Sequence, residues 1–191
     1  MIRVGASIQS ALIAVLAASC GAAPTTVTLP DLDGVLHAPM AVADGQVHVL
    51  VFTSHECPIA NSYAPTLREL ASGWANAPVR LFLIHVDPDL TSDAARAHAR
   101  AYELPGTILL DPRQLTAQAV GATKTPEAVV LTTKGLVYRG RIDDQWSALG
   151  ARTPAAGKYE LRDAVTRVLA GGPAPFQSTP VVGCVMPEPR R

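Results

Sequence analysis

A single cysteine lies at the junction between a predicted strand and a predicted helix. Cys57 follows the hydrophobic run at residues 47–52 after a turn of four residues, and it directly precedes Pro58. A thiol at the start of a helix faces unpaired backbone amides and the positive end of the helix dipole, and both favour the reactive thiolate. Pro58 suits the first helical position, which needs no amide hydrogen. The pattern predicts that Cys57 is a nucleophile; the alternative is a buried, inert thiol.

The residues that precede Cys57 act on its acidity in opposite directions. His55 adds positive charge when it is protonated, whereas the negative charge of Glu56 opposes thiolate formation. Many redox proteins have a second cysteine three residues after the first, but this sequence has Ala60 there. A partner for Cys57 must therefore come from another part of the chain.

Cys184 is the candidate partner, and it lies in the apolar segment VVGCVMP near the end of the chain. Large apolar residues gain nothing from exposure to water, so we expect this segment to dock on the domain. If it reaches Cys57, Cys184 is a resolving cysteine, because exchange requires only that a second thiolate attacks the mixed disulfide. A static disulfide that fixes the tail and an unpaired Cys184 are the alternatives.

Length and composition indicate one globular domain. The chain has 191 residues, of which 48% are hydrophobic, so a sizeable core can form and disorder is excluded for most of the length. Sixteen basic and sixteen acidic residues give a net charge of zero. Charge therefore gives no indication of a nucleic-acid partner or of an acidic membrane surface.

The N-terminal residues 1–23 are predicted to be a secretory signal. They combine Arg3, an apolar run at residues 11–18 and small residues, and the run is too short for a membrane-spanning helix. The segment LAASC resembles a bacterial lipoprotein box, in which Cys20 is lipidated; cleavage near Ala23 is the alternative. We expect an exported protein, either periplasmic or anchored to the membrane by lipid, in a compartment where disulfides persist.

The order of predicted elements indicates an α/β fold with a mixed central sheet flanked by helices. An N-terminal hairpin opens the domain, and an irregular arm rich in proline and glycine, residues 171–191, closes the chain and carries Cys184. The predicted hairpin is 26–36, the strands are 47–52, 79–86, 107–110, 127–133 and 136–142, and the helices are the segment after Cys57, 91–102, 113–120 and 158–170.

This order resembles the thioredoxin fold in its redoxin variant, shared by peroxiredoxins and exported cytochrome-maturation thioredoxins, over residues 26–170. FTSHEC is similar to the turn that presents the family's attacking cysteine, and Pro65 stands where a proline kinks the helix. The segment KTP (124–126) resembles the family's cis-proline loop, which faces the cysteine. More narrowly, ECPIANSYAPTL, YRGRIDD and a late GC resemble uncharacterised bacterial redoxin-domain proteins.

The resemblance implies a thiol–disulfide oxidoreductase without a cofactor, whose partner is a protein thiol or disulfide or a small oxidant. It also implies a cis bond between Thr125 and Pro126, which leaves the backbone of Thr125 open to pair with an extended substrate beside Cys57. An ordinary proline at the start of a strand is the alternative for Pro126. A redoxin-fold domain that binds without catalysis is a further alternative.

A thiol peroxidase is a second alternative. Ser54 and Cys57 are spaced like the Thr/Ser-x-x-Cys motif of peroxiredoxins. However, Leu50 stands where that motif begins with proline, and Lys124 is the nearest cation to the position of the expected arginine.

A copper-handling module is the alternative of a different class. Copper chaperones of this fold use two nearby cysteines and a histidine, and Cu(I) accepts thiolate and imidazole ligands. Here only Cys57, His55 and His85 are candidates, so no metal site is assigned. The polar segment that contains Asp143 and Trp146 is interpreted as a solvated turn with a packing tryptophan; the alternative is a rim of the site.

Overall fold

The hydrophobic run after residue 46 forms the central strand of the sheet. In the computed structural model, which describes residues 26–190, β3 (Val47–Thr53) is buried along its whole length. It pairs in parallel with β4 (Val79–His85) and antiparallel with β7 (Glu127–Thr132). A strand with neighbours on both sides and helices on both faces favours a nearly continuous apolar sequence. The predicted signal sequence and Cys20 lie outside the described residues.

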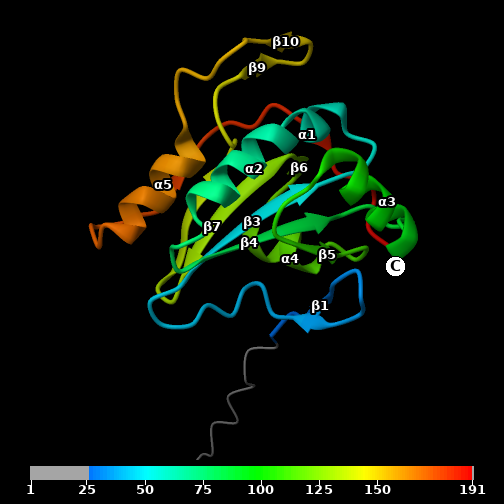
Figure 1. The fold of residues 1–191 in the computed structure, drawn as a ribbon, viewed down its shortest axis with the longest axis horizontal. Helices are drawn as coiled ribbons and strands as arrows, with labels where there is room; N and C mark the ends of the chain where they lie inside the picture. The colour runs from blue at the N-terminus through cyan, green and yellow to red at the C-terminus, as the bar shows by residue number, and fades with distance from the viewer. Residues whose placement is uncertain (1–25, 191) are drawn as a thin grey trace, which may run out of the picture.

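The remaining strands extend this core into a six-stranded mixed sheet with the order β11-β8-β7-β3-β4-β5 (Figure 1). β5 (Thr107–Leu110) continues the parallel half beside β4, and β8 (Gly135–Gly140) forms the predicted hairpin with β7. At the far edge, β11 (Gln177–Ser178) pairs in parallel with β8. The sheet is therefore mixed, as predicted.

Alternate residues of the central strand face two separate hydrophobic clusters. Val49 and Val51 contribute to the first cluster, which α2 and α5 cover, and Leu50 and Phe52 contribute to the second, which α4 and the N-terminal segment cover (Figure 1). The predicted hairpin is present as two short paired strands. The helices and small strands are α2 (Ala64–Gly73), α3 (Ser92–Tyr102), α4 (Leu115–Val120), α5 (Glu160–Leu169), β1 (Leu29–Pro30), β2 (Leu36–His37), β9 (Trp146–Ala148) and β10 (Ala151–Arg152).

The helix that follows Cys57 is divided into two parts. α1 (Pro58–Ser62) ends before Tyr63, and α2 begins one residue later. Pro65 has no amide hydrogen, so it cannot complete the helical bond to the carbonyl of Asn61. The break is the predicted kink, and it separates a short helix that starts at the cysteine from a longer helix that packs on the sheet.

The C-terminal arm returns across the domain and pairs with it twice. In addition to β11, β12 (Cys184–Val185) pairs antiparallel with β6 (Lys124–Thr125). The remainder of the arm is largely irregular, as predicted, and Figure 1 shows it in red passing beside α1. No helix within residues 26–190 is both long enough and apolar enough to cross a membrane.

A close backbone approach fixes the first part of the arm to β8. Thr179 donates its amide to the carbonyl of Arg139 at 3.1 Å, and its hydroxyl lies 2.7 Å from that of Tyr138. A Cβ atom added at Gly140 would lie 2.8 Å from the backbone nitrogen and oxygen of Thr179. Only glycine therefore allows the arm to lie this close.

We expect Gly140→Ala to release the arm and to destabilise the protein by about 1–3 kcal/mol, because the added methyl group overlaps the backbone of Thr179. Thermal melting should show a lower Tm, and limited proteolysis of the reduced protein should cleave residues 171–190 faster than in wild type. Gly73→Ala is the control, since nothing lies within 4 Å of its added Cβ. Equal melting and proteolysis of Gly140→Ala and wild type would contradict this role for Gly140.

Candidate active site

Cys57 caps the N-terminus of α1. Its backbone is extended, and Pro58 is the first helical residue, as predicted. The amide of Ala60 points at Sγ of Cys57 over 3.4 Å, and the amide of Asn61 donates to the carbonyl of Cys57 at 3.0 Å. In the reduced protein the same amide of Ala60 would face the thiolate and stabilise its charge. The position thus has the geometry of a reactive cysteine.

A disulfide joins Cys57 to Cys184, which lies 127 residues further along the chain. The two Cα atoms are 6.1 Å apart, a separation that an ordinary disulfide spans. Cys57 is 2% exposed, whereas Cys184 is half-buried. The structure therefore brings together the two predicted cysteines, and it leaves the one on the arm nearer to solvent.

The cis-proline loop lies against this disulfide. The bond between Thr125 and Pro126 is cis, as predicted, and Sγ of Cys57 is 3.2 Å from the carbonyl oxygen of Thr125. The prediction that the Thr125 backbone is open to a substrate is wrong for this state, because Cys184 of the arm is its strand partner. The arm lies beside the proline because β12 pairs with the backbone of β6, as an added strand would.

Glu127, which sequence reasoning missed, holds this loop in place. Its carboxylate accepts the amides of Thr123 at 2.9 Å and Lys124 at 3.2 Å, and it lies 3.5 Å from Nε of Arg139. The side chain is buried at the start of β7. A carboxylate directly after the cis-proline is thus the anchor of the loop that faces the cysteine.

A second buried carboxylate, Asp87, organises the turn before Cys57. It accepts the hydroxyl of Ser54 at 2.5 Å and the amide of His55 at 3.1 Å, and it lies 3.4 Å from Nδ1 of His85. Burial raises the pKa of Asp87, but the hydrogen bonds from His85, Ser54 and His55 outweigh burial and hold the pKa well below its usual range. Asp87 is therefore ionised under all ordinary conditions.

Asp87 changes the interpretation of the residues that precede Cys57. Ser54, the candidate peroxidase-motif residue, donates its hydroxyl to Asp87 and accepts the amide of Glu56 at 3.3 Å. The imidazole of His55 lies 3.2 Å from Asp87 and 3.9 Å from Glu56, whose side chain is 82% exposed. The imidazole of His55 therefore faces two carboxylates. Sequence reasoning missed Asp87. This residue follows the end of β4, and that end lies beside the end of β3 that leads to Cys57.

A histidine of α3 completes the cluster behind the turn. Nε2 of His98 lies 2.8 Å from Oδ1 of Asn61, whose amide group donates to the carbonyl of His55 at 3.0 Å. The ring of His98 is 5.2 Å from that of His85. Burial, reinforced by the neighbouring charges of His85 and His55, lowers the pKa of His98 to about 4. Within residues 26–190, no three His, Cys, Asp or Glu side chains form a group that could hold a metal ion.

The segment after β8 supports α1 from behind. The hydroxyl of Tyr63 donates to Asp143 at 2.7 Å, and the indole of Trp146 donates to the hydroxyl of Ser62 at 3.2 Å. Asp143 is 2% exposed, and burial raises its pKa. The interpretation of this segment as a solvated turn is therefore wrong for Asp143, because Tyr63 supplies the hydrogen bond that water would otherwise give.

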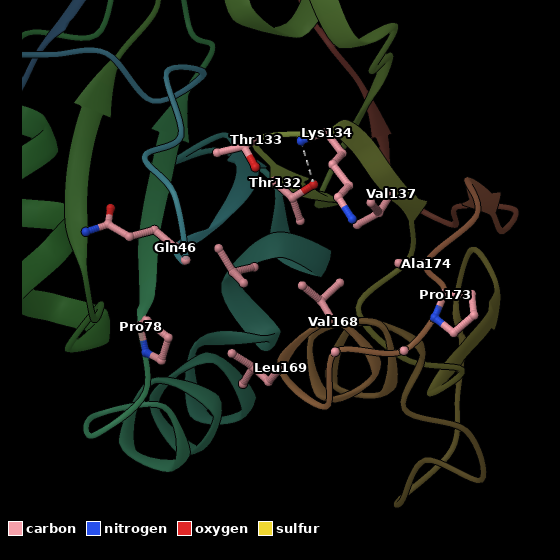
Figure 2. A pocket seen from close by; sticks show the side chains of 14 residues that line it. Gln46, Pro78, Thr132, Thr133, Lys134, Val137, Val168, Leu169, Pro173 and Ala174 are labelled. Atoms are coloured by element: carbon pink, nitrogen blue, oxygen red, sulfur yellow. Dashed lines mark hydrogen bonds between the residues drawn. The ribbon is translucent and has the colours of Figure 1, made fainter.

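Two surface pockets differ in their relation to the cysteines. A pocket of about 410 Å³ lies at the end of the sheet where β3 begins, between the β7–β8 turn and the end of α5 (Figure 2), and it contains no residue of the turn that carries Cys57. A second pocket, of about 440 Å³, adjoins the candidate site and is lined by His55, Glu56, Asp87 and Pro187 of the arm. This second pocket borders the turn before Cys57 and the arm after Cys184, and neither cysteine lines it.

We expect His98→Gln to weaken the acid dependence of stability. The folded-state pKa of about 4 lies below the ordinary value of 6.5, so the unfolded chain binds a proton first and stability falls as the pH drops from about 6.5 to about 4. Gln can still donate to Asn61 but does not titrate. The stabilising effect of Asp87 is lost only below pH 3.8, outside this range.

Urea denaturation at several pH values between 4 and 7 measures this effect. The free energy of unfolding should fall less steeply towards low pH in His98→Gln than in wild type. Identical slopes in the two proteins would show that His98 does not titrate as the structure implies.

Comparisons with known proteins agree with this geometry. Residues 21–142, well over half of the chain, match the model of the AhpC/TSA family. A hypothetical protein from Sinorhizobium meliloti 1021 has 28% sequence identity and a TM-score of 0.69, and the match covers 84% of this chain and 89% of that protein. An uncharacterized conserved protein from Geobacillus kaustophilus has 24% identity and a TM-score of 0.67, with 83% of this chain and 86% of that one covered.

A more distant structure has the same fold. A secreted disulfide oxidoreductase of Mycobacterium tuberculosis, described as homologous to E. coli DsbE, has 20% identity and a TM-score of 0.52; the match covers 76% of this chain and 96% of that protein. The search of the curated proteins found no match. The extent of the family match, the thioredoxin-like fold and a cysteine placed at the helix start opposite a cis-proline together establish that the chain belongs to the AhpC/TSA family.

Proposed function

We propose that the protein is an exported thiol–disulfide oxidoreductase that cycles Cys57 and Cys184 between a disulfide and two thiols. The observation that carries the proposal is the disulfide itself, which joins a helix-capping cysteine to a cysteine on a separate arm beside the cis-proline loop. A disulfide that only fixed the tail would require neither a helix-capping cysteine nor a cis-proline loop beside it. The partner is a protein thiol or disulfide.

In the oxidised protein, the sulfur of Cys184 is the point at which a partner thiolate attacks. Cys184 is half-buried on a two-residue edge strand, whereas Cys57 is buried. Attack at Cys184 breaks the bond to Cys57, which leaves as a thiolate that faces the amide of Ala60. A second thiol of the partner then attacks the mixed disulfide and releases Cys184, so that two partner thiols are oxidised as the protein disulfide is reduced.

In the reduced protein, the thiolate of Cys57 is the attacking group. It forms a mixed disulfide with one sulfur of a substrate disulfide, and the other substrate sulfur leaves as a thiolate that takes up a proton. Cys184 then attacks Sγ of Cys57, restores the internal disulfide and releases the substrate as a dithiol. Every step is an exchange of one disulfide for another, so the direction of the cycle follows from the potentials of the two partners.

An extracytoplasmic location suits this chemistry. Residues 1–23 have the pattern of a secretory signal, and disulfides persist outside the cytoplasm. The Mycobacterium tuberculosis protein of the same fold is described as secreted. If Cys20 becomes the lipidated first residue, the enzyme is held at the membrane surface, with residues 26–170 as its catalytic domain and residues 171–191 as the arm.

The test compares Cys57→Ser and Cys184→Ser with wild type. In the reduced wild type, the alkylation rate of Cys57 should titrate with a pKa below about 8.5, the value of a free cysteine. With an oxidised peptide as substrate, Cys184→Ser should accumulate a long-lived mixed disulfide at Cys57, because its resolving thiol is absent. Wild type should release the peptide. Cys57→Ser should form no mixed disulfide at the start of α1, because it lacks the thiol there.

Two results would contradict this mechanism. Turnover of the peptide disulfide by Cys184→Ser at the wild-type rate would make the internal disulfide a structural bond. Oxidation of the reduced wild type by hydrogen peroxide much faster than by any peptide disulfide would favour the thiol peroxidase instead.

A further inference from the structure

The arm contacts the cis-proline loop in the way an extended peptide would. Cys184 is paired with Thr125 in the short β12–β6 ladder. On one side of this pair, Nζ of Lys124 donates to the carbonyl of Val181 at 3.0 Å. On the other side, the amide of Met186 donates to the carbonyl of Thr123 at 3.2 Å. These contacts are made mainly to the arm's backbone, so they do not depend on most of its side chains.

One arm residue is restricted by the loop, and it directly precedes the cysteine. A Cβ atom added at Gly183 would overlap the carbonyl oxygen of Thr125, and it would lie 2.9 Å from the carbonyl carbon of Thr125 and 3.4 Å from the nitrogen of Pro126. The obstacle is backbone, and Glu127 anchors the amides of the two residues before Thr125, so it cannot move as a flexible side chain would. The φ angle of Gly183 lies outside the left-handed region, so the restriction is one of space alone.

We infer that the arm holds the place of a polypeptide substrate, and that the site selects extended polypeptides whose reacting cysteine directly follows a glycine. The inference rests on the proposed function. A substrate cysteine bonded to Cys57 and paired with Thr125 takes the position of Cys184. The residue before that cysteine then takes the position of Gly183, beside the carbonyl of Thr125, where a side chain does not fit.

The neighbouring arm positions define the rest of the preference. Val182 packs against the first hydrophobic cluster and Met186 against the second, so apolar residues are favoured directly before the glycine and two residues after the cysteine. Val185 is 79% exposed, so the residue directly after the cysteine is free to vary.

The redox state of the arm controls access to this site. While the internal disulfide is intact, the arm is covalently held in the substrate's place. Once Cys184 is reduced, only non-covalent contacts hold it, and a substrate can compete. The thiolate of Cys57 then attacks the sulfur of the substrate's Gly–Cys, the substrate's other sulfur leaves and is protonated, and Cys184 resolves the mixed disulfide when the arm returns.

The experiment uses the reduced full-length Cys184→Ser protein and octapeptides whose cysteine carries a thionitrobenzoate group. Attack by Cys57 on the peptide sulfur releases coloured thionitrobenzoate, so its absorbance reports the rate. Pro-Val-Val-Gly-Cys-Val-Met-Pro, the arm's own sequence, should react about tenfold or more faster than the peptide with alanine in place of glycine. As the control, alanine in place of the valine after the cysteine should leave the rate unchanged.

A change in the protein complements the peptide series. Gly183→Ala in the Cys184→Ser background should weaken docking of the arm and raise the rate with the glycine peptide, because the competitor no longer fits.

The outcomes separate this inference from the proposed function. Equal rates with the glycine and alanine peptides, both dependent on Cys57, would overturn the Gly–Cys preference while the oxidoreductase chemistry stands. An unchanged rate in Gly183→Ala would show that the arm does not compete for the site. Release of thionitrobenzoate that is no faster than in Cys57→Ser would overturn the proposed function itself.

Discussion

The contact on which the site depends is the approach of the arm's backbone to the carbonyl of Thr125, which the absence of a side chain at Gly183 permits. This approach lets β12 pair with β6, and the pairing brings Cys184 within bonding distance of Cys57. In the chain-entropy view, a disulfide that closes a loop of this length, 127 residues apart in sequence, stabilises the fold by about 4–5 kcal/mol. Reduction removes that constraint while the backbone contacts remain, so the arm changes from a bonded element to a docked one.

In the reduced protein, the carboxylate of Asp87 and the thiolate of Cys57 would accept hydrogen bonds from different donors around the turn before α1. Asp87 takes the hydroxyl of Ser54 and the amide of His55, whereas the sulfur of Cys57 takes the amide of Ala60 at the start of the helix. A carboxylate close to a thiolate would ordinarily raise the thiol's pKa. Because donors on the turn and on β4 already satisfy Asp87, the helix amide remains available to the sulfur.

The sequence predicts those parts of the fold that depend on local pattern, and the parts that depend on distant partners escape it. The apolar run of β3, the helix start at Cys57 and the kink at Pro65 are each visible within a few residues, and all three are present. Asp87 and Glu127 gain their roles from neighbouring strand ends. Asp143 is buried with a hydrogen bond from Tyr63, which lies 80 positions away in the sequence, so no local pattern reveals this contact. A two-residue strand such as β12 has no periodicity to detect; only the apolar residues around Cys184 indicated that the arm docks.

The separation of the two cysteines has a consequence that a closely spaced pair on one helix would not have. A second cysteine at the position of Ala60 would stay beside Cys57 whether or not a substrate were bound. In the proposed mechanism the resolving thiol belongs to the same segment that fills the substrate's place, so the substrate's extended segment must leave the loop, while its sulfur is still bonded to Cys57, before Cys184 can attack. Because the arm is covalently joined to the domain at residue 170, its local concentration at the site stays high, and it returns once the substrate is bound less tightly. The mixed disulfide must form before it can be resolved, and the shared position adds that the arm leaves the loop for the first exchange and occupies it again for the second.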